Sequence, residues 1–199
     1  YTSLFTFIQY RRRWVPRILI YFKILALITT KYVINKFFEM KNVNFNIDFT
    51  LYNSKNALSD DVAKLMKAAE KARQKAYAPY SKFLVGAALK LENGEIITGN
   101  NQENAAYPSG LCAERNAIFY AGSKFPNIKI LQMAISAGSK SKGANKPIAP
   151  CGACRQVLAE YEQLQNTPIE LYFMGTGGEI AYSKSVENIL PWIFDRNML

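Results

Sequence analysis

The three cysteines of this 199-residue chain lie in two short motifs, and the chain contains no histidine. One motif is Cys-Ala-Glu from Cys112 to Glu114, and the other is Pro-Cys-Gly-Ala-Cys from Pro150 to Cys154. Each lies at the predicted start of a helix, where unpaired N–H groups and the helix dipole favour thiolates. The first helical turn also brings positions i and i+3 to one side, so Cys151 and Cys154 can direct both sulfurs to one point. A fold that uses both motifs must bring two helix starts together.

These counts exclude several kinds of chemistry. Without histidine, the chain has no Ser-His-Asp or Cys-His nucleophile system and no His-ligated metal. A small, odd number of cysteines argues against a secreted disulfide scaffold, and reduced thiols favour the cytosol. We therefore expect a cytoplasmic protein.

Three thiolates directed at one point suit Zn²⁺. A structural zinc site normally has four Cys or His ligands, whereas this chain has three such residues in all. The fourth position is then open to water, as in catalytic zinc sites. Two alternatives stay open here: a Cys-x-x-Cys that only packs, and a zinc site completed by a partner chain.

Glu114 favours the catalytic interpretation. A carboxylate two residues after Cys112 can lie beside the metal, accept a proton from an activated water and pass it on. The alternative is a first-turn glutamate that complements the helix dipole.

The charge is unevenly distributed along the chain. Residues 1–40 hold seven basic side chains and one acidic side chain, whereas the remainder holds 18 basic and 14 acidic ones. The composition changes at Met40, so we predict a basic, apolar extension over residues 1–39 that is not part of the fold, and one domain over residues 40–199. A basic membrane-surface helix is the alternative for the extension, which has no apolar run near the roughly 18 residues of a membrane span. We expect no membrane partner, and the mixed charge after Met40 predicts no nucleic-acid partner.

From Met40 the hydrophobic pattern predicts an α/β domain. The predicted helices run from a cap at Ser59 to near Pro79, over Cys112–Ala121 with a stop at Gly122, over Cys151–Gln165, and over Ser185–Leu190. The predicted strands are an edge strand in Asn42–Leu51, a hairpin of Phe83–Leu91 and Glu95–Thr98 around Asn93-Gly94, and then Ile128–Ala137, Ile169–Met174 and Ile180–Tyr182.

Taken together, these motifs resemble the small, homotetrameric, three-cysteine type of cytidine deaminase. The matching runs are Cys112-Ala113-Glu114-Arg115 and Pro150-Cys151-Gly152-Ala153-Cys154-Arg155-Gln156. The resemblance extends from about Leu58 to Phe194, through Ala76–Ser81 and Phe83–Ala88, and does not cover residues 1–39. It implies a three-layer α/β/α fold with a mixed five-stranded sheet, whose strand order comes from the family.

The resemblance also implies the reaction and its cofactor. The reaction is hydrolytic deamination of cytidine and deoxycytidine, with release of ammonia, in pyrimidine salvage. One Zn²⁺ per subunit would be held by Cys112, Cys151 and Cys154, with Glu114 as the general base and acid. Arg115 would withdraw charge from the thiolates, and Gln156 would help to orient the groups around the ligands.

The family pattern assigns substrate-binding roles as well. Asn101 and Glu103 match the pair that hydrogen-bonds the ribose hydroxyls, and Phe83 matches the aromatic that stacks on the base. Ala113 is assigned to the substrate site. Tyr107 and Phe194 match aromatics near the subunit interfaces, and Phe194 would enter the active site of a neighbouring subunit.

Three other functions compete with this one. Aminonucleoside antibiotic deaminases share the metal motifs, but the Asn101/Glu103 pair favours a free nucleoside. A nucleic-acid editor needs an open basic channel, which the mixed charge after Met40 does not suggest. A zinc-stabilised binding module has no use for Glu114 or an open fourth position.

Overall fold

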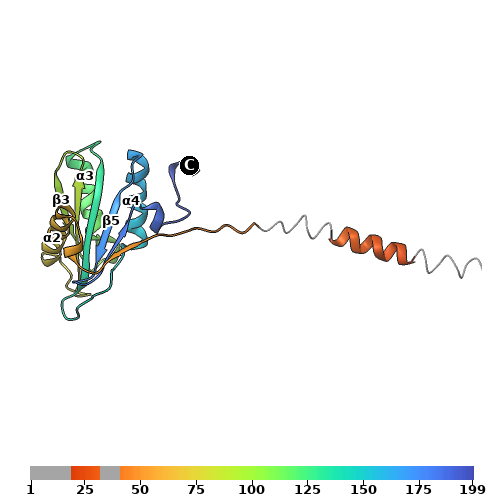
Figure 1. The fold of residues 1–199 in the computed structure, drawn as a ribbon, viewed down its shortest axis with the longest axis horizontal. Coiled ribbons are helices and arrows are strands. Elements are labelled where there is room, and N and C mark those ends of the chain that lie inside the picture. Colours follow the sequence, from red (N-terminus) through yellow and green to blue (C-terminus); the bar gives the residue numbers. More distant parts are fainter. Residues whose placement is uncertain (1–18, 32–40) are drawn as a thin grey trace, which may run out of the picture. The chain divides into compact units, whose positions relative to one another are not determined.

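The computed structural model describes residues 19–31 and 41–199. The chain divides into two units, Tyr1–Asn44 and Phe45–Leu199. In the first unit, residues 19–31 form a helix (orange in Figure 1) whose apolar side chains are exposed. In the described ranges, no helix is long and apolar enough to cross a membrane. The predicted extension over residues 1–39 falls largely outside those ranges, so that boundary stays a prediction.

The second unit is a mixed sheet between helices (Figure 1). The strand order is β1-β6-β5-β4-β2-β3; β4 and β5 are parallel, and the other pairs are antiparallel. The strands are β1 (Thr50–Tyr52), β2 (Phe83–Leu91), β3 (Ile96–Asn100), β4 (Ile130–Ser139), β5 (Glu170–Met174) and β6 (Ile180–Ser183). The α-helices of this unit are α2 (Asp60–Gln74), α3 (Ala113–Lys124) and α4 (Gly152–Gln165).

Each face of the sheet has its own core. Helix α2 buries Leu65, Met66 and Ala69 against one face, where they meet Ala88 and Ala134 of the central strands. Helices α3 and α4 cover the other face, with Ile118 and Leu158 packed among residues such as Leu89, Met133 and Leu171. Because β4 is covered on both sides, it is buried along most of its length. The predicted three-layer α/β/α fold is confirmed.

The strand count was wrong, because the sheet has six strands rather than five. The extra strand is β1, which lies at the edge of the sheet beside β6. An edge strand was predicted over Asn42–Leu51, but only Thr50–Tyr52 pairs with the sheet. Before Thr50, the backbone of Asp48 is not paired with a strand. Its N–H and carbonyl form hydrogen bonds with the Asn188 side chain.

Two predicted helix ends were also wrong. Helix α2 ends at Gln74, well before Pro79, and Tyr77 then pairs with Gln102 in a parallel β-bridge. Helix α3 continues through Gly122 to Lys124. A Cβ at Gly122 would lie 2.7 Å from the Tyr161 hydroxyl, so this glycine allows α3 and α4 to approach rather than ending α3.

The remaining helix differences are local. Ser59 occupies the N-cap position of α2, but its side chain makes no capping hydrogen bond. The helix predicted over Ser185–Leu190 is a 3-10 turn at Glu187–Ile189.

A second glycine controls how closely α3 lies to the sheet. A Cβ at Gly99 of β3 would lie 2.5 Å from the Ala113 carbonyl oxygen and 2.7 Å from the Ala117 nitrogen, both backbone atoms of α3. Backbone atoms of a helix cannot move aside as the end of a flexible side chain can. Gly99 therefore fixes the position of α3, which begins immediately after Cys112.

We predict that Gly99→Ala lowers the free energy of unfolding by about 1–3 kcal/mol, the usual cost of overpacking. Urea denaturation measures this change. Gly177→Ala is the matched control, because a Cβ there has no atom within 4 Å. An equal loss in both variants would show that close approach at Gly99 is not the cause.

Candidate metal centre and active site

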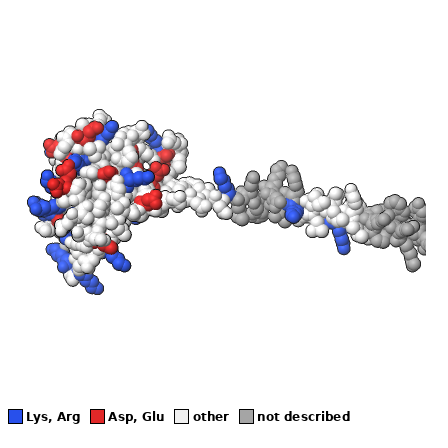
Figure 2. Space-filling model, in the orientation of Figure 1, with Lys and Arg blue, Asp and Glu red and all other residues white. Residues whose placement is uncertain are grey.

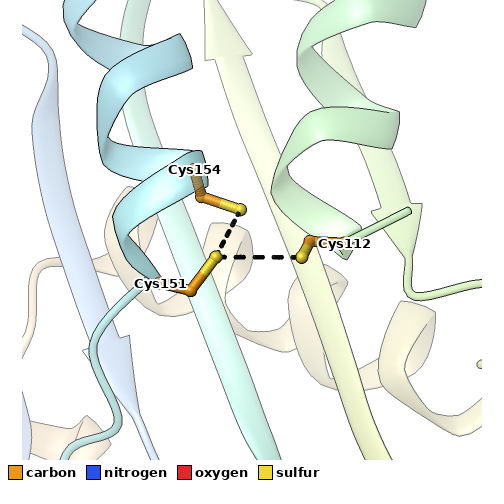
Figure 3. A group of neighbouring side chains, drawn as sticks. All are labelled: Cys112, Cys151 and Cys154. Atoms are coloured by element: carbon orange, nitrogen blue, oxygen red, sulfur yellow. Dashed lines mark hydrogen bonds between the residues drawn. The ribbon is translucent and has the colours of Figure 1, made fainter. Parts of the chain in front are cut away.

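The starts of α3 and α4 meet beside the sheet, and the cysteines lie there (Figure 3). Cys112 is the N-cap residue of α3 and Cys151 is that of α4, both with extended backbone. Cys154 lies in the first turn of α4. The Sγ atoms of Cys112 and Cys151 are 3.9 Å apart, those of Cys151 and Cys154 are 3.5 Å apart, and all three lie within 4.8 Å of one another.

This arrangement fits a zinc ion. Tetrahedral coordination with Zn–S bonds of about 2.3 Å places ligand sulfurs about 3.8 Å apart, close to the spacing found here. Among the described residues, the cluster contains no fourth Cys, His, Asp or Glu ligand. Cys154 is buried, whereas Cys151 is exposed, so an ion here would have protein on one side and an approach from the other.

The surroundings favour a thiolate at Cys112. Hydrogen bonds from the Cys154 thiol and the Arg115 guanidinium lower the pKa of Cys112 to about 5. The Arg115 Nη2 atom lies 3.6 Å from the Cys112 sulfur. The hydrogen bond that the Cys154 thiol makes to Cys112, together with burial, raises the pKa of Cys154. Zinc takes cysteine as the thiolate, so a deprotonated Cys112 is prepared for the metal.

Glu114 is a buried acid beside this cluster. Its side chain is in the first turn of α3, and the residue is only 4% exposed. Burial raises the pKa of its carboxyl group, and the nearby Cys112 charge acts in the same direction. A carboxyl group that holds its proton more readily than usual suits proton transfer near neutral pH.

A cavity of about 480 Å³ opens onto Cys112, Cys151 and Glu114. This volume is in the range of small-molecule sites and accommodates a nucleoside. Its walls come from β2, the segment after β3, the start of α3 and the loop before α4. The predicted site residues among its lining are Phe83, Asn101, Glu103, Tyr107, Cys112, Glu114, Arg115 and Cys151.

Asn101 and Glu103 hold one wall of this cavity in place. Asn101 accepts a hydrogen bond from the Val85 nitrogen at 2.7 Å and donates one to the Phe83 carbonyl at 2.9 Å. The Glu103 carboxylate accepts hydrogen bonds from the backbone nitrogen of Tyr80 at 2.9 Å and from Ser81. The Ser81 hydroxyl lowers the pKa of Glu103, which keeps it an acceptor.

Other predicted residues lie at the rim or elsewhere. Tyr107 is 86% exposed at the cavity edge, whereas Ala113, the first residue of α3, is fully buried and does not line the cavity. Phe194 is 57% exposed and lies outside the cavity lining of its own chain. Gln156 donates a hydrogen bond to the Phe194 carbonyl at 2.8 Å, so its structural partner is the C-terminal segment.

Two residues that received no role from the sequence contribute here. Ser81 binds Glu103, and its hydroxyl also accepts a hydrogen bond from the Phe83 nitrogen at 3.0 Å. Arg155 donates to the Pro150 carbonyl at 2.8 Å and to the Ile189 carbonyl at 2.9 Å. Both residues lie inside the motifs that carry the family resemblance, and this position was the only sequence feature that could have indicated their roles.

Comparison with known proteins places the chain in a family. The family described as "Cytidine and deoxycytidylate deaminase zinc-binding region" matches residues 59–168. A cytidine deaminase of Sporosarcina psychrophila is 42% identical over 139 residues, which cover 70% of this chain and 95% of that protein. One of Halalkalibacterium halodurans is 42% identical over 130 residues, 65% of this chain and 91% of that protein.

Solved structures agree with this placement. The crystal structure of cytidine deaminase from Burkholderia pseudomallei matches with a TM-score of 0.58 and 37% identity, over 69% of this chain and 100% of that one. The chain belongs to the cytidine and deoxycytidylate deaminase family. This is a zinc-binding family, so the fold class and the zinc cofactor predicted from the sequence are confirmed.

We predict that replacing any one of Cys112, Cys151 or Cys154 by serine lowers bound zinc from about one ion per chain to well below half, because a two-thiolate remnant binds zinc weakly. Metal analysis of the purified proteins measures this. Ser136→Ala, a buried change in β4, is the control and keeps its zinc. Full zinc content in a cysteine variant would remove that residue from the ligand set.

Proposed function

We propose that this chain hydrolyses cytidine and deoxycytidine to uridine and deoxyuridine and releases ammonia. The observation that carries the proposal is a buried glutamate and three clustered cysteines at one nucleoside-sized cavity. Relatives that share up to 42% of their residues with this chain are named cytidine deaminases, which supports the same substrate class here.

Glu114 carries the proton transfers. Zinc held by Cys112, Cys151 and Cys154 would act as a Lewis acid and lower the pKa of the attacking water. Glu114 accepts a proton from the attacking water and gives it to N3 of the base as the water oxygen adds to C4. Glu114 then takes the remaining hydroxyl proton and delivers it to the exocyclic amine. The C4–N bond breaks, ammonia leaves and the C4 carbonyl of uridine forms.

The other cavity residues bind and orient the nucleoside. Asn101 and Glu103 are the proposed partners of the ribose hydroxyls, because an amide and a carboxylate together offer a donor and acceptors to a diol. Phe83, 36% exposed at the cavity, offers a flat face to the pyrimidine. Arg115 donates to the Cys112 sulfur and draws charge from it, which offsets the excess negative charge of three thiolates.

We predict that Glu114→Gln lowers kcat for cytidine by about 10²–10⁴-fold, the usual contribution of a general acid and base. The glutamine keeps the size of the side chain but cannot carry the proton. Ammonia release and zinc content are measured together. Glu95→Gln, in the exposed hairpin, is the control. Substantial turnover by Glu114→Gln at normal zinc content would contradict the assignment.

We further propose that the active enzyme is a homotetramer in which neighbouring subunits complete each site. Phe194 and Tyr107 are large apolar residues that this chain leaves exposed. A single soluble chain gains by covering such residues, and the family pattern places both near subunit interfaces. In this arrangement Phe194 closes a neighbour's cavity rather than its own.

We predict that Phe194→Ala raises KM for cytidine by about tenfold, the effect of removing a central interface aromatic. Subunits of Phe194→Ala mixed and reassembled with subunits of Glu114→Gln then form sites that contain both wild-type residues. At cytidine concentrations below KM, the mixture should therefore exceed the summed activities of the separate proteins. Additive activity, or a monomer in sedimentation velocity, would contradict a shared site.

Substrate comparison separates the competing deaminases. The proposal predicts faster turnover of cytidine than of an aminonucleoside antibiotic or a cytosine-containing single-stranded oligonucleotide. Lys and Arg alternate with Asp and Glu over the face of the domain in Figure 2, without the continuous basic track that a polymer needs on that face. Oligonucleotide deamination at a rate that rivals cytidine would favour an editing enzyme.

We also propose that residues 40–199 form the catalytic domain, that residues 1–39 are dispensable for turnover, and that the protein works in the cytoplasm. Support for the first two comes from the family match, which begins at residue 59. The three free thiols suit a reducing compartment. A chain that begins at Met40 is then expected to keep its cytidine turnover.

A further inference from the structure

A short segment outside the family match lies against the C-terminal end of the domain. This segment, Phe45–Phe49, is called the arm here, and it leads into β1. The matched region begins at residue 59. The arm packs against the C-terminal segment, Leu190–Phe194, which ends in the proposed interface phenylalanine. The two segments are far apart in sequence but packed together in space.

Asn188 anchors the arm beside this segment. Its Oδ1 atom accepts a hydrogen bond from the Asp48 nitrogen at 3.1 Å, and its Nδ2 atom donates to the Asp48 carbonyl. The side-chain amide thus pairs with one residue of the arm as a neighbouring strand would. Nδ2 also donates to the Ser183 hydroxyl at 3.0 Å, which links the arm to the end of β6. Phe49 adds an edge-to-face contact with Phe173 of β5, with ring centroids 6.1 Å apart.

Trp192 is the residue of the C-terminal segment that meets the arm. Its backbone has φ of 63°, in the left-handed region that bulky residues rarely occupy. Its indole ring packs on Phe45, with ring centroids 5.5 Å apart. A strained backbone persists only where its surroundings hold it, and the Phe45 ring is one such contact.

The other side of the same turn is held by α4. Gln156 donates to the Phe194 carbonyl at 2.8 Å, and Arg155 donates to the Ile189 carbonyl at 2.9 Å. Trp192 therefore lies between two fixed points, with the arm holding its ring and α4 holding the backbone after it. The direction in which Phe194 leaves the domain depends on both.

We propose that the arm is a positioning element for Phe194: Phe45 holds Trp192 in its left-handed conformation and so fixes where the segment presents Phe194 to a neighbouring subunit. This inference rests on the proposed function, in which Phe194 completes a neighbour's site. Without the ring of Phe45, the segment samples other conformations, and only the fraction in the correct one completes that site. The apparent substrate affinity falls by that fraction, while turnover at saturation changes little.

The test uses the full chain with Trp14→Phe, which leaves Trp192 as the single indole. Steady-state kinetics with cytidine, Trp192 emission and the thermal midpoint are measured for Phe45→Ala, Phe45→Tyr and Ile47→Ala. We expect Phe45→Ala to raise KM about two- to tenfold, the effect of losing an aromatic pair, with kcat within about twofold of the parent. Its Trp192 emission changes as the indole, which is already 73% exposed, loses its contact with the Phe45 ring.

The other two variants separate positioning from general packing. Phe45→Tyr keeps the ring and is expected to retain the parent KM and emission. Ile47→Ala removes an apolar side chain of similar exposure from the same arm but leaves the aromatic pair, so its KM also stays near the parent value. An emission shift in Phe45→Ala without a change in KM, or equal KM increases in Phe45→Ala and Ile47→Ala, would overturn the proposal. Absence of cytidine turnover in the parent chain would instead overturn the proposed function.

Discussion

The starts of α3 and α4 must meet beside the sheet for the three cysteines to form one cluster. Strands β4 and β5 run parallel, so α4 must start near the edge where β4 ends and carry the chain back to the edge where β4 begins. Helix α3 lies on the same face and reaches the same edge. Gly99 and Gly122 allow the close approaches that this requires, one to the sheet and one between the helices. The sulfurs, Glu114 and the cavity all take their positions from that meeting point.

The clustered thiolates concentrate negative charge, which Arg115 partly neutralises. Three thiolates and one divalent ion carry a net negative charge, and a buried glutamate lies beside them. Arg115 donates to the Cys112 sulfur, and its own pKa is raised by that contact. Its Nε atom is buried without a hydrogen-bond partner in the described part of the chain. The guanidinium therefore contacts the cluster through Nη2 while it also lines the cavity.

The sequence could predict the parts of the site that local spacing determines. Cys112, Cys151 and Cys154 stand at helix starts, and a helix start fixes where the following side chains point. Tertiary contacts decided the rest. Gly122 was expected to end α3, but the packing of Tyr161 on it outweighs its low helix propensity. Gln156 was expected near the metal ligands, yet its partner lies 38 residues further along the chain. No local pattern signals such a pairing.

Three thiolates hold the zinc, and one coordination position is left for a non-protein ligand. X-ray absorption at the zinc edge of the purified full chain can count these ligands. The structure predicts about three sulfur neighbours near 2.3 Å and one lighter atom, which is replaced or displaced when a cytidine-like inhibitor binds. A spectrum with four sulfurs, or one that the inhibitor does not alter, would mean a closed structural site and would rule out an open catalytic zinc.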